Sequence, residues 1–393
     1  MPDLNTLPVI SNSRQPRGAV KLGGVVIDRD SSGTEKSRVE TSPDYVDGWI
    51  SWEVDNNAYR GADTFRITFS ITSLPKSHGV DWFSRQSAIN VEIFANENPV
   101  DPSKYQPSSA DRLIYGNVDE VSIDQVHGTV DLHGRDLTAL LIDTKSSEHF
   151  SNQTASQIAT TFAVRNNLGT SQIFKTKTKA GDYYQIDHDS TTQMQSEWDL
   201  LSFLANAEGF LVYVVGKDLF FGPQQDQKDE YVISWEKPNL NRDFPISNVI
   251  DLQFSRALHI AKGISVEVHS WNTKQKKGFS AFWPRVAKSI RPGEAMPRTQ
   301  AYRYTFPGLT QEQANQRAQS IYAQIIAHTM NLTAYMPGDG LLDCSKKIRV
   351  QGTESAFDQI YYPESVMRSM SIGEGYRMNI RAKNTSPELD VSA

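Results

Sequence analysis

The stretch Thr64–Ile71, TFRITFSI, indicates the fold class of the first half of the chain. Phe65, Ile67 and Phe69 alternate with polar residues, and this period of two is typical of a half-buried strand. The stretch 87–94, SAINVEIF, repeats the pattern after the turn residues LPKSHG. Several short alternating strands at this spacing favour an antiparallel barrel or sandwich.

The period changes to that of a helix in the middle of the chain. Thr154 and Gln157 form a capping-box pattern in front of apolar residues at helical spacing. A second helix is predicted over 196–209, SEWDLLSFLANAEG, and a hairpin over 210–222, FLVYVVGKDLFFG. Strands return in the last third, with one predicted helix at 310–329 among them. The sequence therefore predicts a β-rich α+β fold.

These patterns divide the chain into four segments. We expect a polar N-terminal arm at 1–40, a first β-barrel domain at 41–145, an α+β domain at 146–235 and a second β-barrel region at 236–393 that carries the inserted helix. Inside the arm, GGVVI at Gly23–Ile27 fits either a short strand or a loose tail.

Net charge, the length of apolar runs and the cysteine count exclude several classes of protein. The net charge of −6 over 393 residues argues against a protein that grips DNA, because phosphate contacts need a basic face. No stretch approaches the ~20 apolar residues that span a bilayer, and we expect neither a membrane contact nor a signal peptide. Cys344 is the single cysteine, which leaves no intrachain disulfide and no cysteine metal cluster.

Candidates for chemistry are few. The sequence lacks the common signatures GxSxG, HExxH, GxxxxGK[ST] and GxGxxG. His127 and His133 lie too far apart on an extended strand to chelate one ion, and the run 187–189, Asp-His-Asp, is typical of a turn. We expect no catalytic residue, no cofactor and no metal. A two-carboxylate glycosidase stays open as an alternative, since such a site needs only one acid and one nucleophile or base.

A basic run lies near residue 275. Lys274, Lys276 and Lys277 in WNTKQKKG fit the charged tip of a hairpin. We expect this loop to contact another protein rather than DNA.

The segment 133–145, HGRDLTALLIDTK, resembles the late-control and baseplate hub family of contractile phage tails. The residues that carry the resemblance are Gly134, Arg135, Asp136, Ala139, Leu141 and Asp143. The helix TASQIATTFA, the helix ending in LANAEGF, the following hairpin and VEVHSWNTKQKKG at 266–278 appear in a similar order. The likeness spans roughly residues 45–280.

The resemblance implies a structural protein of the virion tail baseplate, assembled in the cytoplasm of a bacterial host. Members form homotrimers in which each chain contributes two tube-like antiparallel β-barrels. The resulting pseudo-sixfold ring joins the sixfold tail tube, or its initiator protein, to the threefold central spike. Other baseplate proteins surround it, and DNA passes through its channel without tight binding.

The resemblance implies no enzyme activity. The alternatives are a cell-envelope-degrading or sugar-binding tail-tip module, or the equivalent hub of a non-contractile tail, a tailocin or a secretion-system spike. At the junction itself, we expect Asp136 to cap the turn or helix that begins at Leu137, and Arg135 to bridge to a carboxylate.

Overall fold

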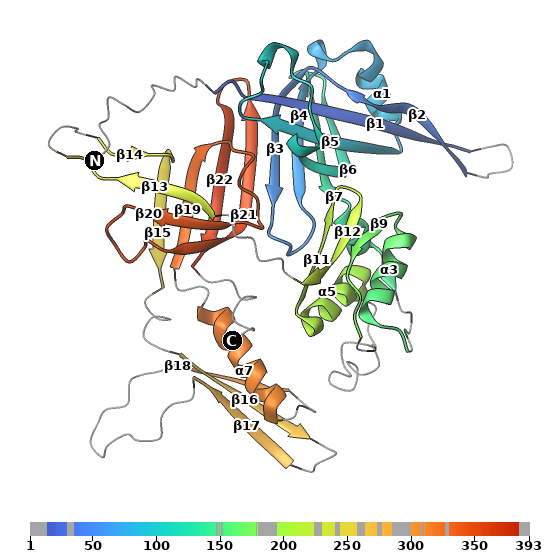
Figure 1. Cartoon of the computed structure of the whole chain (residues 1–393). Coiled ribbons are helices and arrows are strands. Elements are labelled where there is room, and N and C mark those ends of the chain that lie inside the picture. The colour runs from blue at the N-terminus through green and yellow to red at the C-terminus, as the bar shows by residue number, and fades with distance from the viewer. Residues whose placement is uncertain are drawn as a thin grey trace.

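One continuous sheet runs through both β-rich parts of the protein in the computed structural model (Figure 1). The model describes residues 14–29, 35–146, 148, 150, 152–177, 179, 195–223, 230–239, 244–257, 264–272, 277–284, 300–306, 309, 311–326 and 330–384. The main sheet has 14 strands, and the α+β domain and a small inserted unit lie beside it. No described helix is both long and apolar enough to cross a membrane.

The first half of the main sheet encloses an apolar core. Its elements are β1 (Arg17–Arg29), β2 (Glu35–Tyr45), β3 (Trp49–Asn56), β4 (Thr64–Ser70), α1 (Val80–Arg85), β5 (Ala88–Asn96), β6 (Arg112–Asp124) and β7 (Thr129–Asp136). The predicted alternation is observed in β4, where Phe65, Ile67 and Phe69 are buried and the residues between them face outward. Short 3₁₀ helices occupy Ile71–Ser73, Lys76–His78, Pro102–Lys104 and Ser109–Asp111.

The structure differs from the prediction of a polar arm at 1–40. The part of this segment from Arg17 onward contributes β1, which pairs along its length with β5 and buries Val20 and Leu22. Gly23 and Gly24 interrupt the alternating pattern by which this strand could be recognised in the sequence. At Gly24 a Cβ atom would lie 2.6 Å from the Trp82 ring, so close packing requires the residue that weakens the strand pattern.

The α+β domain holds its own core, to the lower right in Figure 1. Its elements are α2 (Thr138–Asp143), β8 (Lys145–Ser146), α3 (Ala155–Arg165), β9 (Gly169–Ile173), β10 (Gln195–Ser196), α5 (Glu197–Glu208), β11 (Phe210–Val215) and β12 (Asp218–Pro223). The capping box of Thr154 and Gln157 is confirmed. Gly209 ends α5 in the left-handed conformation, with φ of 68°.

The second half of the main sheet follows. Its strands are β13 (Glu230–Glu236), β14 (Ile246–Ser247), β15 (Asp251–Arg256), β19 (Met330–Pro337), β20 (Lys347–Gln351), β21 (Ile360–Ser371) and β22 (Gly375–Lys383). The prediction assigned residues up to 235 to the α+β domain. The structure instead pairs β13 in parallel with β20, a long-range contact that no local sequence pattern reveals.

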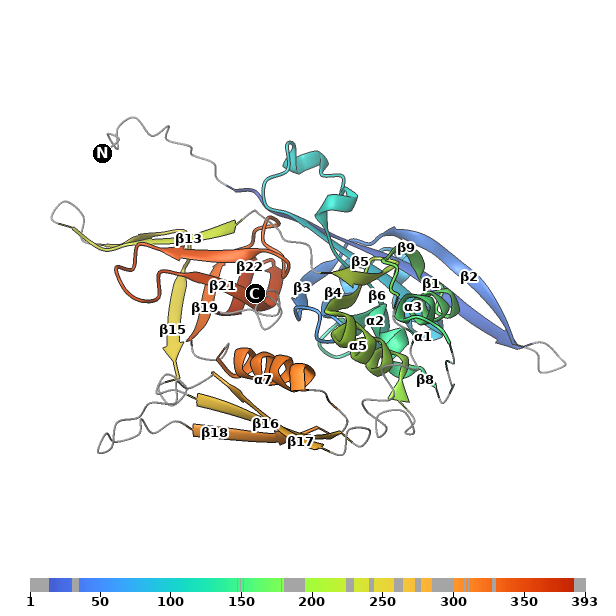
Figure 2. The same ribbon diagram turned by 60° about the horizontal axis from the view of Figure 1, so that its bottom comes forward.

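A small unit is inserted between β15 and β19. It consists of β16 (Ile264–Asn272), β17 (Lys277–Trp283), β18 (Gln300–Thr305) and α7 (Gln311–Ile326). The helix α7 lies within the predicted range 310–329 and packs its small residues Ala314 and Ala318 on the sheet. Figure 2 shows α7 on the side of this small sheet that faces the main sheet.

The two halves of the main sheet repeat one arrangement. Across the sheet the central strands follow the order β6-β7-β4-β3-β21-β22-β19-β15. A shift of four strands superposes β3 on β15, β4 on β19, β6 on β21 and β7 on β22, and this is also their order along the chain. All matched neighbours are antiparallel. The described strands therefore contain a structural duplication.

A matched pair of bulges supports the duplication. The register of β6 against β7 shifts between Val118 and Glu120, and that of β21 against β22 shifts between Pro363 and Ser365. Each bulge residue is acidic and binds a cation on the neighbouring strand. The two ion pairs are Asp119 with Arg135 and Glu364 with Lys383.

The core of the first half yields a stability prediction. Ile67 is fully buried, whereas Ile372 is 79% exposed in the turn after β21. Replacing Ile67 by Ala should lower the free energy of unfolding by about 2–5 kcal/mol, since it leaves a cavity. Ile372→Ala should change it by less than about 0.5 kcal/mol. Denaturant unfolding of both variants measures the difference, and equal effects would contradict this description of the core.

Candidate functional site: the strand–helix junction and the polar sheet face

The segment that carries the family resemblance lies where the main sheet joins the α+β domain. Gly134, Arg135 and Asp136 end β7, and α2 starts two residues later. A Cβ atom on Gly134 would lie 2.4 Å from the Phe65 ring and 2.2 Å from the carbonyl oxygen of Asn117. Only glycine allows the strands to pack this closely.

Arg135 clamps three elements together. Its Nε and Nη2 donate to the two carboxylate oxygens of Asp119 at 2.7 and 3.0 Å. Its Nη1 and Nη2 donate to Asp143 at 3.1 and 2.8 Å. Arg135 thus ties the bulge of β6 and the end of β7 to the end of α2. Paired carboxylates raise the pKa of its guanidinium, which is charged at any relevant pH.

Asp136 organises the turn into α2 from inside the protein. It is 7% exposed, and its carboxylate accepts hydrogen bonds from the backbone N–H of Thr138 at 3.1 Å and from the Thr138 hydroxyl at 2.9 Å. Burial, together with the nearby carboxylate of Asp63, raises the pKa of Asp136 to about 8. Burial also raises the pKa of Asp63. The junction therefore contains two neighbouring buried carboxyl groups.

The remaining residues of the motif complete the connection. Ala139 and Leu141 are buried, and Leu141 belongs to the core of the α+β domain. Asp143 is exposed and binds Arg135. The motif therefore fixes the α+β domain to the first half of the sheet.

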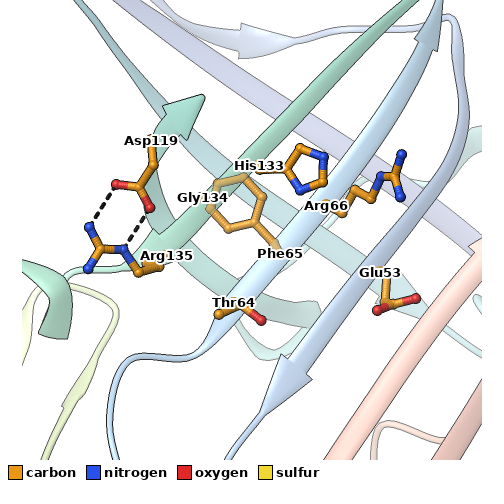
Figure 3. Close-up of a pocket in the computed structure, with 8 residues that line it drawn as sticks. All are labelled: Glu53, Thr64, Phe65, Arg66, Asp119, His133, Gly134 and Arg135. Atoms are coloured by element: carbon orange, nitrogen blue, oxygen red, sulfur yellow. Dashed lines mark hydrogen bonds and ion pairs between the residues drawn. The ribbon is translucent and has the colours of Figure 1, made fainter. Parts of the chain in front are cut away.

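A polar surface begins beside this junction. Residues of β3, β4, β6 and β7 line a hollow of about 400 Å³. Figure 3 shows these residues, and its dashed lines mark the Arg135–Asp119 pair. The lining residues are Glu53, Thr64, Phe65, Arg66, Asp119, His133, Gly134 and Arg135. Arg66 also binds a carboxylate, that of Asp131 at 3.3 Å. Both arginines of the hollow are therefore neutralised by neighbours.

The same side of the sheet continues into the second half. Along each of the eight central strands, side chains that point into the core alternate with side chains that point to the opposite side. We call this opposite side of the sheet the polar sheet face. Its charged members are Glu53, Asp55, Arg66, Asp119, Glu120, Asp124, Asp131, Arg135, Asp251, Glu364, Arg377, Arg381 and Lys383. Carboxylates outnumber arginines, and they gather on the first half.

Other residues singled out in the sequence lie elsewhere. Lys274 and Lys276 lie outside the described residues, and Lys277 begins β17, opposite Asn272 on β16. His127 binds Asp124 at 2.7 Å in the turn before β7, and the run at 187–189 lies outside the described residues. Within the described part of the chain, no group of three His, Cys, Asp or Glu residues could hold a metal ion.

Cys344 lacks the properties of a nucleophile. Burial raises the pKa of its thiol to about 12, so the thiolate is scarce at neutral pH. Its sulfur donates to the carbonyl oxygen of Asn56 at 3.4 Å.

Two important acidic residues escape sequence reasoning. Asp119 is one of several acids in NVDEVSID, and only the bulge in β6 turns it toward Arg135. Asp63 follows an ordinary turn, and its role depends on the buried contact with Asp136. Neither position has a local sequence signal.

Asp136 yields a prediction on pH. Because the pKa of Asp136 lies near 8 in the folded chain and near 3.8 in an unfolded one, the folded chain binds the additional proton between these values. The stabilisation is complete below about pH 4 and is lost as the pH rises toward 8. Asp136→Asn should flatten this decline in unfolding free energy. Denaturant titrations from pH 5 to 9 test it, and an unchanged slope in the variant would contradict it.

Comparisons with known proteins identify the fold. No protein-family model and no curated protein match the chain. The tail protein from Neisseria meningitidis MC58 is similar over 93% of this chain and 96% of its own, with 13% identity and a TM-score of 0.57. The 43 kDa tail protein of prophage MuSo2 from Shewanella oneidensis is similar over 95% and 99%, with 14% identity and a TM-score of 0.59.

A third solved structure agrees with these two. The prophage tail protein gp18 from Listeria monocytogenes EGD-e is similar over 93% of this chain and 94% of its own, with 9% identity and a TM-score of 0.51. Over nearly its whole length, the chain therefore has the fold of phage tail proteins, as its resemblance to the baseplate hub family predicted.

Proposed function

We propose that the protein is the structural hub of a phage or phage-like tail, a trimer that joins the tail tube to the central spike. The observation that carries this proposal is the duplicated sheet. One chain supplies two equivalent sets of four strands side by side, with one polar face in common. A threefold assembly of such chains has six equivalent sets, which matches a sixfold tube on one side and a threefold spike on the other.

The dimensions suit a channel. Eight central strands per chain give 24 in three copies, and at ~4.8 Å per strand they form a ring of roughly 115 Å circumference. Such a ring is roughly 37 Å across between opposite backbones, and strand tilt widens it. The polar sheet face lines this channel in the proposed assembly, and the two apolar cores lie outside it. DNA fits inside without contact on all sides.

The charges of the polar sheet face favour passage over binding. Arg66 and Arg135 are held by carboxylates, and the first half carries an excess of acids. Arg377 and Arg381 on β22 face the same side and are too few to form a continuous basic path. Passing phosphates therefore meet a wall that holds them weakly.

An enzyme of the cell envelope is the alternative of a different class. Such a site needs paired carboxylates in an accessible cleft, one of them with a raised pKa. Asp63 and Asp136 have raised pKa values, but Asp136 is buried and both its oxygens accept hydrogen bonds from Thr138. The hydrogen bonds that Asp136 accepts from Thr138 hold the turn into α2, so we favour the structural role. The alternatives within the structural class are the equivalent hubs of a tailocin, a non-contractile tail or a secretion-system spike.

The proposed trimer can be measured directly. Light scattering of the purified protein should give three times the chain mass of 44.1 kDa, and electron microscopy should show a ring with an axial channel. A protein that is monomeric both at high concentration and in assembled particles would exclude the hub.

The proposed channel predicts weak DNA binding. The isolated protein should not bind double-stranded DNA measurably at physiological salt, because each firm phosphate contact would add affinity and salt dependence. A variant with Lys274, Lys276 and Lys277 replaced by Gln should lose particle assembly, since we assign these lysines to a protein contact. Tight, salt-dependent DNA binding that this variant abolishes would contradict both assignments.

A further inference from the structure

Among the eight central strands, two edges lack a neighbour among the described strands. β15 is the last strand of the second half and pairs with β19 alone. β6 pairs with β5 only as far as Asn117, so its remaining residues up to Asp124 have β7 as their single described partner. Such edges expose backbone N–H and C=O groups that a further strand can pair with.

The duplication shows what each edge corresponds to. β15 is the equivalent of β3, and β6 is the equivalent of β21. Within the chain, β3 pairs with the second half of β21, and β20 pairs only with the first half of β21. In the same way, β5 pairs only with the first half of β6 and leaves the second half open. The open edges of β15 and β6 are therefore equivalent to the edges of β3 and β21 that pair with each other.

Side-chain burial agrees with this relation. On the paired strands, Trp52 and Val54 of β3 are 1% and 0% exposed, and Val366 of β21 is 0% exposed. The equivalent residues at the open edges are only partly buried. They are Leu252 and Phe254 on β15 and Val121 on β6. Equivalent side chains are therefore buried where β3 pairs with β21 and partly exposed at the open edges of β15 and β6.

The register follows from one row of paired residues in each half. In the first half the row is Trp52, Ile67, Leu132 and Val121. In the second half it is Leu252, Ala334, Ile380 and Val366. Since Val366 is paired with Asn56, Val121 corresponds to a partner at Arg256, four residues beyond Leu252.

We propose that β15 of one copy pairs with the open edge of β6 in a second copy, in the register that β3 and β21 use within the chain. Phe254 then lies opposite Ile123 on the core side, and Ser255 lies opposite Ser122 on the polar side. This interface rests on the proposed trimer and specifies it. One chain carries both edges, so the contact is head to tail and closes into a ring when the step between halves is the same within and between chains.

A cysteine pair tests the register. Ser122→Cys with Ser255→Cys, in a Cys344→Ala background, should form disulfides between copies and give a covalent trimer on a denaturing, non-reducing gel. Opposed residues on antiparallel strands lie about 4.5–5.5 Å apart, within the range of a disulfide. Each single-cysteine variant should stay uncross-linked.

Two matched pairs serve as controls. Glu53 and Ser369 are paired across β3 and β21, so their cysteine variant should form a disulfide within the chain and no covalent oligomer. Glu120→Cys with Ser255→Cys shifts the pair by two residues, about 7 Å along the strand, and should cross-link poorly. A trimer in solution that the Ser122–Ser255 pair does not cross-link overturns this interface and leaves the proposed function intact. A chain that stays monomeric overturns both.

Charge at the same position gives a second test. Ser255 would lie between the flanking carboxylates of Glu120 and Asp124 on the second copy. Ser255→Glu should weaken each interface roughly two- to fivefold, whereas Ser255→Lys should keep or strengthen it. Dilution of the trimer, followed by light scattering, compares the two variants. Equal dissociation of both would overturn the proposed pairing.

Discussion

The pairing of β3 with β21 is the constraint on which the rest of the structure depends. It joins two halves that could each close on their own core, and it makes them one sheet with one polar face. Because side chains alternate along a strand, a shift of this pairing by one residue would exchange core and surface on one side. The row of Trp52 and Val54 against Met370 and Arg368 therefore fixes both halves.

Polar contacts give this pairing its specificity. Arg368 is 4% exposed and donates to the side-chain oxygen of Asn56 at 2.8 Å, and also to the carbonyl oxygen of Leu342. Asn56 in turn donates to Asp63 at 2.7 Å. A buried cation whose Nη1 and Nη2 hydrogen bonds form only in one register penalises every other register. The chain of contacts reaches the backbone of Asp136, so the pairing and the junction are parts of one network.

Local sequence patterns predicted individual helices and strands. They did not predict which strands pair, because that pairing joins residues far apart in the sequence. The alternation around Ile67 and the capping box at Thr154 depend on neighbours in sequence, and both were predicted. For the strand at Arg17–Arg29, the sequence offered only a short strand at Gly23–Ile27 as one of two alternatives, because paired glycines interrupt its pattern. The sequence does not reveal the duplication because equivalent positions differ in residue type, as where Trp52 corresponds to Leu252.

The same reasoning explains the candidate site. The segment at Gly134–Asp136 could be selected from the sequence, since its residue types suit a tight turn out of a strand. The residues that bind this segment could not be selected from the sequence. Asp119 reaches Arg135 only through a bulge, and Asp63 reaches the junction only through the fold.

The distance along the chain between β3 and β21 has a consequence for synthesis. Ser365 binds Asp55 across 310 residues, so the edge of β3 opposite β4 has no partner until nearly the whole chain has left the ribosome. Until then its edge is open to other nascent chains, and contacts of such long range form slowly. The first half must therefore wait as a compact intermediate, and late translation becomes the step most exposed to misassembly.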